Sequence, residues 1–278
     1  PFLVLTPACV ALGVACVHWA HGHFNPLQAL LVLLGAVAAH ISVNAFNEYL
    51  DFHSGLDAIT LRTPFSGGSG VLPSHPELSG STLAMALVSL GLSMGVGLYF
   101  VMLRGPALLP LGVTGVTLVL AYTRWITRQS LLCLVAPGLG FGPLMVMGTY
   151  VALTGEYSTS AAGASLVPFF LVSNLLLLNQ FPDADADRQV GRRHMLVTQG
   201  PAIAAKWYAA FTVMAFISLL FCVLAGLLPP GALLGVLMLV VAVPTVRDVL
   251  THAHHVERLL PAMGRNVLIN LMTPTLMA

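Results

Sequence analysis

Apolar residues run in long stretches along this chain, and short polar or Gly/Pro-containing segments separate them. A helix needs about 20 apolar residues to cross a bilayer. The runs, of 15 to 24 residues, are close to that length and lack the period-two alternation of a membrane β-strand. The pattern therefore predicts nine membrane-spanning helices, near residues 1–20, 28–46, 80–103, 107–123, 131–152, 161–181, 206–226, 232–247 and 264–278.

The composition supports an integral membrane protein. Of the 278 residues, 57% are hydrophobic and only 8% are charged, whereas soluble domains carry about 25% charged residues. Nine spans leave no room for a large extramembrane domain, so we expect one all-α transmembrane domain over residues 1–278. A net charge of +1 without a basic run excludes a nucleic-acid partner.

Basic residues are sorted between alternate loops. Arg104 is the one basic residue on one face of the expected bundle. The other face holds Arg62, Arg124, Arg128, Arg188, Arg192, Arg193, Lys206, Arg247, Arg258 and Arg265. By the positive-inside rule the basic face is cytoplasmic. We therefore expect a multi-pass protein of the prokaryotic inner membrane, with a central cavity open to the cytoplasm.

Six of the ten acidic residues form two clusters after the second and sixth expected helices. The clusters are Glu48, Asp51 and Asp57, and Asp183, Asp185 and Asp187. The expected topology places both clusters at the cytoplasmic side, where they can face each other across a cavity. Ionisable groups at membrane depth are costly and usually functional.

Asparagines precede the acids at helical spacing. The first series is Asn44, Asn47 and Asp51 at i, i+3 and i+7, and the second is Asn179, Asp183 and Asp187 at i, i+4 and i+8. Carboxylates at this spacing repel one another unless a cation lies between them. Carboxylate and amide oxygens suit Mg²⁺, whose remaining ligands are often substrate phosphates. The clusters therefore predict a site for Mg²⁺ and a diphosphate.

Cationic and glycine-rich segments follow both clusters. Arg62 precedes Gly67-Gly68-Ser69-Gly70, a type of loop whose backbone N–H groups can approach an anion. After the second cluster come Arg188, Arg192, Arg193 and Lys206. Arginine pairs with diphosphate oxygens in bidentate fashion, so these residues are candidates to neutralise the substrate charge.

Two segments resemble the aspartate-rich motifs of the UbiA superfamily of intramembrane prenyltransferases. The first is Asn44-Ala45-Phe46-Asn47-Glu48-Tyr49-Leu50-Asp51, with Gly55 and Asp57 after it. The second is Asn179-Gln180-Phe181-Pro182-Asp183-Ala184-Asp185-Ala186-Asp187-Arg188, with Gly191-Arg192-Arg193 after it. Within the superfamily, the chain is most similar to the 1,4-dihydroxy-2-naphthoate branch of menaquinone biosynthesis.

The resemblance implies a nine-helix bundle that binds two Mg²⁺ ions and transfers a polyprenyl group from its diphosphate to an acceptor, usually an aromatic ring. The metal positions match Asn47, Asp51, Asp57, Asn179, Asp183 and Asp187. Catalysis is expected from Asp51, Asp57, Asp183, Asp187 and Arg62. Substrate binding is expected from Asn44, Asn47, Arg62, Asn179, Arg192, Arg193, Lys206 and Tyr122, and the ring of Tyr122 can stabilise an allylic cation.

Departures from the naphthoate branch leave the acceptor open. Glu48 stands where an aspartate is more common, the stretch from Tyr122 lacks the usual Gly/Pro-rich segment, and Phe141 replaces an acid. The first candidate for the acceptor is a quinone precursor such as 1,4-dihydroxy-2-naphthoate, and a non-aromatic lipid alcohol is an alternative. A cation-coupled transporter is the alternative from another class, although its acids would be expected near the bilayer midplane.

Overall fold

The computed structural model describes residues 2–60 and 62–278, and every regular element in them is helical. Seven segments are long and apolar enough to cross a membrane: Phe2–His21, Pro26–Ser54, Pro76–Arg104, Ser130–Thr154, Thr159–Gln189, Pro201–Leu224 and Pro230–His252. Pro106–Ala121 is a shorter apolar helix. The predicted all-helical, multi-pass architecture is confirmed for the described residues. Pro1, in the first predicted span, and Leu61 lie outside them.

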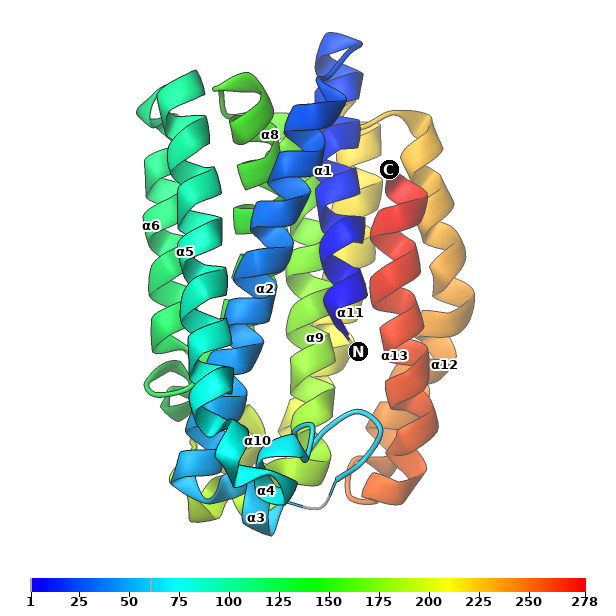
Figure 1. Ribbon diagram of the computed structural model, residues 1–278. Helices are drawn as coiled ribbons and strands as arrows, with labels where there is room; N and C mark the ends of the chain where they lie inside the picture. The colour runs from blue at the N-terminus through cyan, green and yellow to red at the C-terminus, as the bar shows by residue number, and fades with distance from the viewer. Residues whose placement is uncertain (1, 61) are drawn as a thin grey trace.

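The long elements run along one axis and the short ones gather at one end (Figure 1). The long elements are α1 (Leu5–His21), α2 (Pro26–Ser54), α5 (Ser79–Arg104), α6 (Leu109–Ala121), α7 (Ser130–Leu139), the π-helix η5 (Gly140–Met147), α8 (Gly148–Thr154), α9 (Thr159–Gln189), α11 (Pro201–Leu224), the 3₁₀ segment η6 (Pro230–Met238), α12 (Leu239–His252) and α13 (Val256–Met277). The short helices are α3 (Leu56–Ile59), α4 (Val71–Ser74) and α10 (Met195–Gln199).

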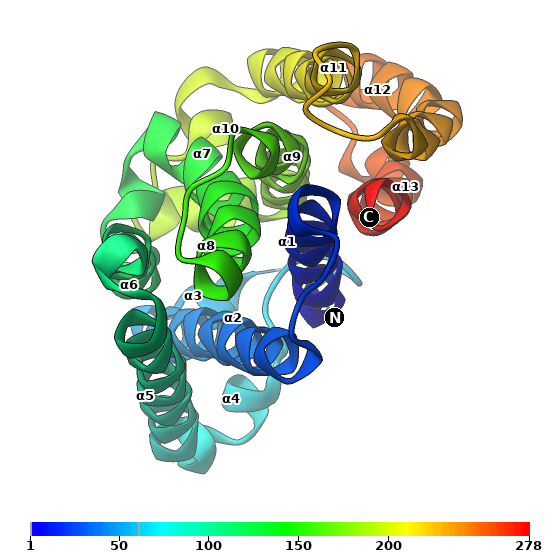
Figure 2. The same ribbon diagram turned by 90° about the horizontal axis from the view of Figure 1, so that it is seen from above.

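Helices α1 and α9 lie between two groups of helices (Figure 2). On one side are α2, α5, α6 and α8, and on the other are α11, α12 and α13. In the most apolar part of α9, 78% of the residues are buried inside the protein, compared with 17% in the Pro76–Arg104 segment. Helix α9 is therefore the central support, and it carries the second acidic motif.

Helix α2 is longer than its hydropathy predicts. It begins at Pro26, where the Asn25 side chain accepts hydrogen bonds from the N–H groups of Leu27 and Gln28. It ends at Gly55, whose φ of +77° favours glycine. The predicted end near residue 46 is wrong, and so is the end of α9 near residue 181. Both helices continue past these positions, so Glu48 and Asp51 lie on α2, and Asp183, Asp185 and Asp187 lie on α9. Asp57 alone follows its long helix, in α3.

Two glycines allow α7 and the π-helix η5 to pack closely on α9. A Cβ added at Gly138 would lie 2.1 Å from the carbonyl oxygen of Phe169, and one at Gly142 would lie 2.4 Å from that of Ser165. This spacing of four residues is the small-residue pattern of close packing between membrane helices. The two glycines therefore fix the distance between α9 and the wall that α7 and η5 form.

We predict that Gly138→Val destabilises the protein, because the added side chain collides with the backbone of α9. Overpacking of this kind costs about 1–3 kcal/mol, so the thermal unfolding midpoint in detergent should fall by roughly 2–10 °C. Gly140→Ala is the control, since its Cβ would meet no atom within 4 Å. An unchanged midpoint for Gly138→Val would contradict this packing.

Candidate functional site

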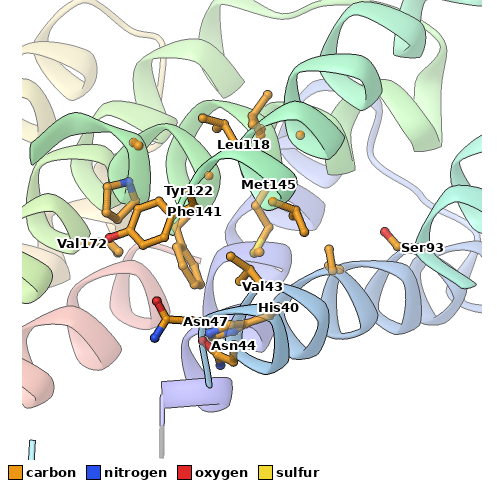
Figure 3. A pocket seen from close by; sticks show the side chains of 18 of the residues that line it. His40, Val43, Asn44, Asn47, Ser93, Leu118, Tyr122, Phe141, Met145 and Val172 are labelled. Atoms are coloured by element: carbon orange, nitrogen blue, oxygen red, sulfur yellow. The ribbon is translucent and has the colours of Figure 1, made fainter. Parts of the chain in front are cut away.

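A cavity of about 780 Å³ lies among α2, α5, α6, η5 and α9. Most of its wall is apolar and comes from side chains such as Val96, Val116 and Leu144. Polar side chains gather at the end near the short helices, and Figure 3 shows Tyr122 and Phe141 across from Asn44 and Asn47 of α2. The cavity therefore combines one polar end with a long apolar remainder.

The polar end brings the two acidic clusters together. Its lining includes Asn44, Asn47 and Asp51 from α2, Asp57 from α3, Asn179, Asp183 and Asp187 from α9, and Arg192 and His194 from the segment after α9. These residues are far apart in sequence, yet they line one cavity. All six predicted metal ligands are among them.

Arg192 bridges the two clusters. Its guanidinium donates to Oδ1 of Asp51 and, at 2.9 Å, to Oδ1 of Asp187. The second oxygen of Asp51 accepts from Nδ2 of Asn47 at 2.7 Å, and that of Asp187 pairs with Nε2 of His194 at 2.8 Å. Both carboxylates are buried, so this network supplies the positive charge and the hydrogen bonds that burial requires.

Three other oxygens at this end have no partner. Oδ2 of Asp57, Oδ1 of Asn179 and Oδ1 of Asp183 are buried and accept no hydrogen bond from the described residues. Native proteins rarely leave buried acceptors unpaired, and hard oxygen ligands such as these fit a divalent cation. No three His, Cys, Asp or Glu side chains in the described part of the chain surround one point. A cation here would therefore take amide and substrate oxygens as well.

The environment of Asp57 favours a cation too. Burial, and then the negative charges of Asp51 and Glu48, raise the pKa of Asp57 to about 7, against the opposing charges of Arg192 and Arg62. A divalent cation beside this carboxylate would reverse the shift by favouring its ionised form. The group is therefore poised to exchange a proton for a metal ion.

The glycine-rich loop folds over the polar end. The Glu48 carboxylate accepts hydrogen bonds from the backbone N–H and the hydroxyl of Ser69, so Glu48 holds this loop in place. Ser66, Gly67 and Gly68 line the cavity. Gly68 has a φ of +69°, and a Cβ there would lie 3.1 Å from Oδ1 of Asp57. The loop thus brings its backbone against the first cluster.

The other predicted site residues divide into two groups. Tyr122 lines the cavity. Arg62 is exposed and packs on Gly70, where a Cβ would lie 2.1 Å from its Nη1. Arg193 and Lys206 are exposed and lie outside the cavity lining. The structure therefore does not bring these three cationic side chains into the described site.

Sequence reasoning gave no role to Thr123, whose hydroxyl donates to Oδ1 of Asn47 at 3.2 Å. This bond orients the Asn47 amide toward Asp51. Nothing in the sequence signals it, because Thr123 lies 76 residues from its partner. His194 pairs with Asp187. The only indication of this in the sequence is that His194 directly follows the Arg192-Arg193 pair.

Comparison with known proteins identifies a family. Residues 4–258 match the sequence profile of the UbiA prenyltransferase family. A Bacillus subtilis protein named 1,4-dihydroxy-2-naphthoate octaprenyltransferase is 26% identical over 213 residues, which are 73% of this chain. The alignment covers 65% of that relative, so the chain spans just under two thirds of its length.

Solved structures share the fold. A UbiA homologue from Aeropyrum pernix in its apo form has a TM-score of 0.72 at 16% identity, with 98% of this chain and 94% of that one covered. A homologue from Archaeoglobus fulgidus bound to DMAPP and Mg²⁺ has a TM-score of 0.61 at 12% identity, with the same coverage of both chains. At these identities the likeness concerns the fold alone.

We predict that Arg192→Gln binds Mg²⁺ alone more tightly than the unchanged protein does. The substitution leaves Asp51 and Asp187 without their shared counter-charge, so the dissociation constant measured by titration calorimetry should fall by about tenfold or more. Arg193→Gln is the control, because Arg193 is exposed and away from the cavity. Arg192→Lys keeps the charge and should bind Mg²⁺ weakly, as the unchanged protein does. Equal affinity in the Gln and Lys variants would show that the guanidinium does not compete with the metal.

Proposed function

Since this chain belongs to the UbiA prenyltransferase family, as its two motifs predicted, we propose that it transfers a polyprenyl group from its diphosphate to an aromatic acceptor inside the membrane. One observation carries the proposal: both acidic clusters meet at the polar end of a cavity that is otherwise apolar. A diphosphate with a long hydrocarbon chain has the same division into a charged head and an apolar tail.

The residues of the polar end would hold the diphosphate with Mg²⁺. We assign the metal ligands to Asn47, Asp51, Asp57, Asn179, Asp183 and Asp187. The buried, unpartnered oxygens of Asp57, Asn179 and Asp183 support this assignment. Bound Mg²⁺ would stabilise the charge that develops on the departing diphosphate. Arg192, already beside both clusters, can turn from the carboxylates to the diphosphate oxygens.

The other cations would act at the edge of the site. Arg62 lies near enough to Asp57 to oppose its raised pKa, so a small movement of the loop would bring its guanidinium to the diphosphate. Arg193 and Lys206 are exposed, and we propose that they attract the anionic substrate toward the cavity. Asn44 lines the cavity one turn beyond Asn47 and is placed to contact the substrate near its first prenyl carbon.

The apolar wall would serve the hydrocarbon part of the reaction. Side chains of α5 and α6 can take up the prenyl chain and exclude water from the allylic cation. The ring of Tyr122 lines the cavity close to the polar end, where its face can stabilise that cation. Breakage of the C–O bond to the diphosphate forms this cation. A ring carbon of the acceptor then attacks the first prenyl carbon, the proton on that ring carbon leaves, and diphosphate is released.

The acceptor we propose is a quinone precursor, with 1,4-dihydroxy-2-naphthoate first. The name of the B. subtilis relative and the aromatic side chains of the cavity support this choice. We further propose one prenyltransferase domain over residues 1–278, with nine spans in a prokaryotic inner membrane. The acid-bearing end, where all the basic residues except Arg104 lie in the loops and adjoining helix turns, would then face the cytoplasm.

An assay of purified protein tests this proposal. We expect Mg²⁺-dependent transfer of a polyprenyl group to dihydroxynaphthoate when it is offered beside hydroxybenzoate, homogentisate and a glycerol-phosphate lipid, with products identified by mass. Asp183→Asn should lower kcat/KM by about 100-fold or more. Asp185→Asn is the matched control, since Asp185 is exposed and pairs with Arg188 at the surface, and it should change kcat/KM by less than about twofold.

Other outcomes would revise the proposal in defined ways. A product with the glycerol lipid alone would replace the aromatic acceptor and keep the diphosphate site. No product with any acceptor, together with no binding of a polyprenyl diphosphate, would contradict prenyl transfer altogether.

A further inference from the structure

A histidine lies in the cavity wall, away from both acidic clusters. His40 is part of α2 within the membrane-spanning segment Pro26–Ser54, and only 6% of its surface is exposed. It lines the cavity beside Phe141 (Figure 3). Ionisable side chains are expensive at this depth and are usually retained for function. The proposed roles of the polar end do not involve this residue.

His40 continues the polar stripe of α2. With Asn44, Asn47 and Asp51 it follows the spacing i, i+4, i+7 and i+11, so the four side chains share one helical face. Two turns of helix, about 10 Å, separate His40 from Asn47. This distance leaves room for a ring system between His40 and a diphosphate bound at the polar end. The opposite wall, from α5 and α6, carries no titratable side chain among the residues that line the cavity.

Two contacts fix the imidazole. Its Nδ1 lies 2.8 Å from the hydroxyl oxygen of Thr6, and its ring meets that of Phe141 edge to face with centroids 4.9 Å apart. Buried helical threonines such as Thr149 and Thr273 donate to the carbonyl four residues earlier. Thr6 makes no such bond among the described residues, so its proton is free for Nδ1. This assignment leaves the ring proton on Nε2.

Nε2 has no hydrogen-bond partner among residues 2–60 and 62–278. A prenyl chain offers it none, because hydrocarbon has no acceptor atom, and a polar group facing hydrocarbon is left unsatisfied. The acceptor substrate is different, since a quinone precursor carries hydroxyl or carboxylate oxygens around its ring. Phe141 and Tyr122 also provide aromatic faces close by.

We propose that Nε2–H of His40 donates a hydrogen bond to a ring oxygen of the acceptor and so determines which acceptors bind. The proposal rests on prenyl transfer as the function, and it names the part of the cavity that takes the acceptor. The polar stripe then has two uses along α2: Asp51 and Asn47 serve the diphosphate, and His40, held by Thr6, serves the ring. The prenyl chain occupies the α5–α6 side.

Steady-state kinetics with each substrate varied in turn test the assignment. His40→Leu should raise the KM for the acceptor by about tenfold or more, with the KM for the polyprenyl diphosphate within about twofold of the unchanged protein. His40→Gln keeps an N–H donor and should recover most of the affinity for the acceptor. Ser42→Ala is the matched control, because Ser42 is a buried polar residue of the same helix that donates to the carbonyl of Ala86. It should change neither KM.

Acceptor analogues that lack one ring oxygen in turn identify the bonded atom. The correct analogue should bind the unchanged protein as weakly as the parent acceptor binds His40→Leu, and the variant should not distinguish the two. A rise in the KM for the diphosphate, or equal acceptor KM values in His40→Leu and the unchanged protein, would overturn the assignment while prenyl transfer stands. Absence of product from the unchanged protein would instead count against the proposed function.

Discussion

Buried carboxylates must be neutralised, and the rest of the site depends on how this chain does it. Asp51 and Asp187 come from different helices, lie almost completely out of solvent and share the guanidinium of Arg192. Removing one partner from such a network leaves an uncompensated buried charge, which commonly costs about 3–5 kcal/mol. The network therefore ties the end of α2 to the end of α9, and that tie brings the two aspartate-rich motifs to one cavity.

The same constraint separates two sets of polar residues at this end of the cavity. Asp51 and Asp187 already have hydrogen-bond partners for both carboxylate oxygens, whereas Asp57, Asp183 and Asn179 each have a buried oxygen without a hydrogen-bond partner. In the proposed site the second set would bind the metal, and the first set would exchange Arg192 for metal or share it with a diphosphate. A charged head could then enter while Asp51 and Asp187 keep a cationic partner throughout. Beyond it the cavity wall is apolar, and α7 and η5 pack closely on α9 at Gly138 and Gly142, an arrangement that would exclude water.

Much of the fold could be predicted from hydropathy, because long apolar runs have few alternatives in a bilayer. The helix ends could not, since Asp51 and Asp183 interrupt hydropathy without interrupting the helix. The motifs identified the acids, but spacing cannot tell that Arg192 turns inward while Arg193 stays exposed. Contacts such as Thr123 with Asn47 and Thr6 with His40 join helices distant in sequence. The π-helix η5 contains Pro143, which cannot donate the usual helical hydrogen bond, and hydropathy does not reveal this change of helix type.

The position of Mn²⁺, used in place of Mg²⁺, tests most directly whether the two clusters form one metal–diphosphate site. Crystals grown with Mn²⁺ and a non-hydrolysable polyprenyl diphosphate analogue would locate the metal by its anomalous scattering. We expect Mn²⁺ between the ends of α2 and α9, bonded to oxygens of Asp57, Asn179 and Asp183 and to the diphosphate. We also expect that Arg192 has moved from Asp51 or Asp187 to the analogue. Mn²⁺ bound elsewhere, with the analogue outside the cavity and the Arg192 bridge unchanged, would contradict it.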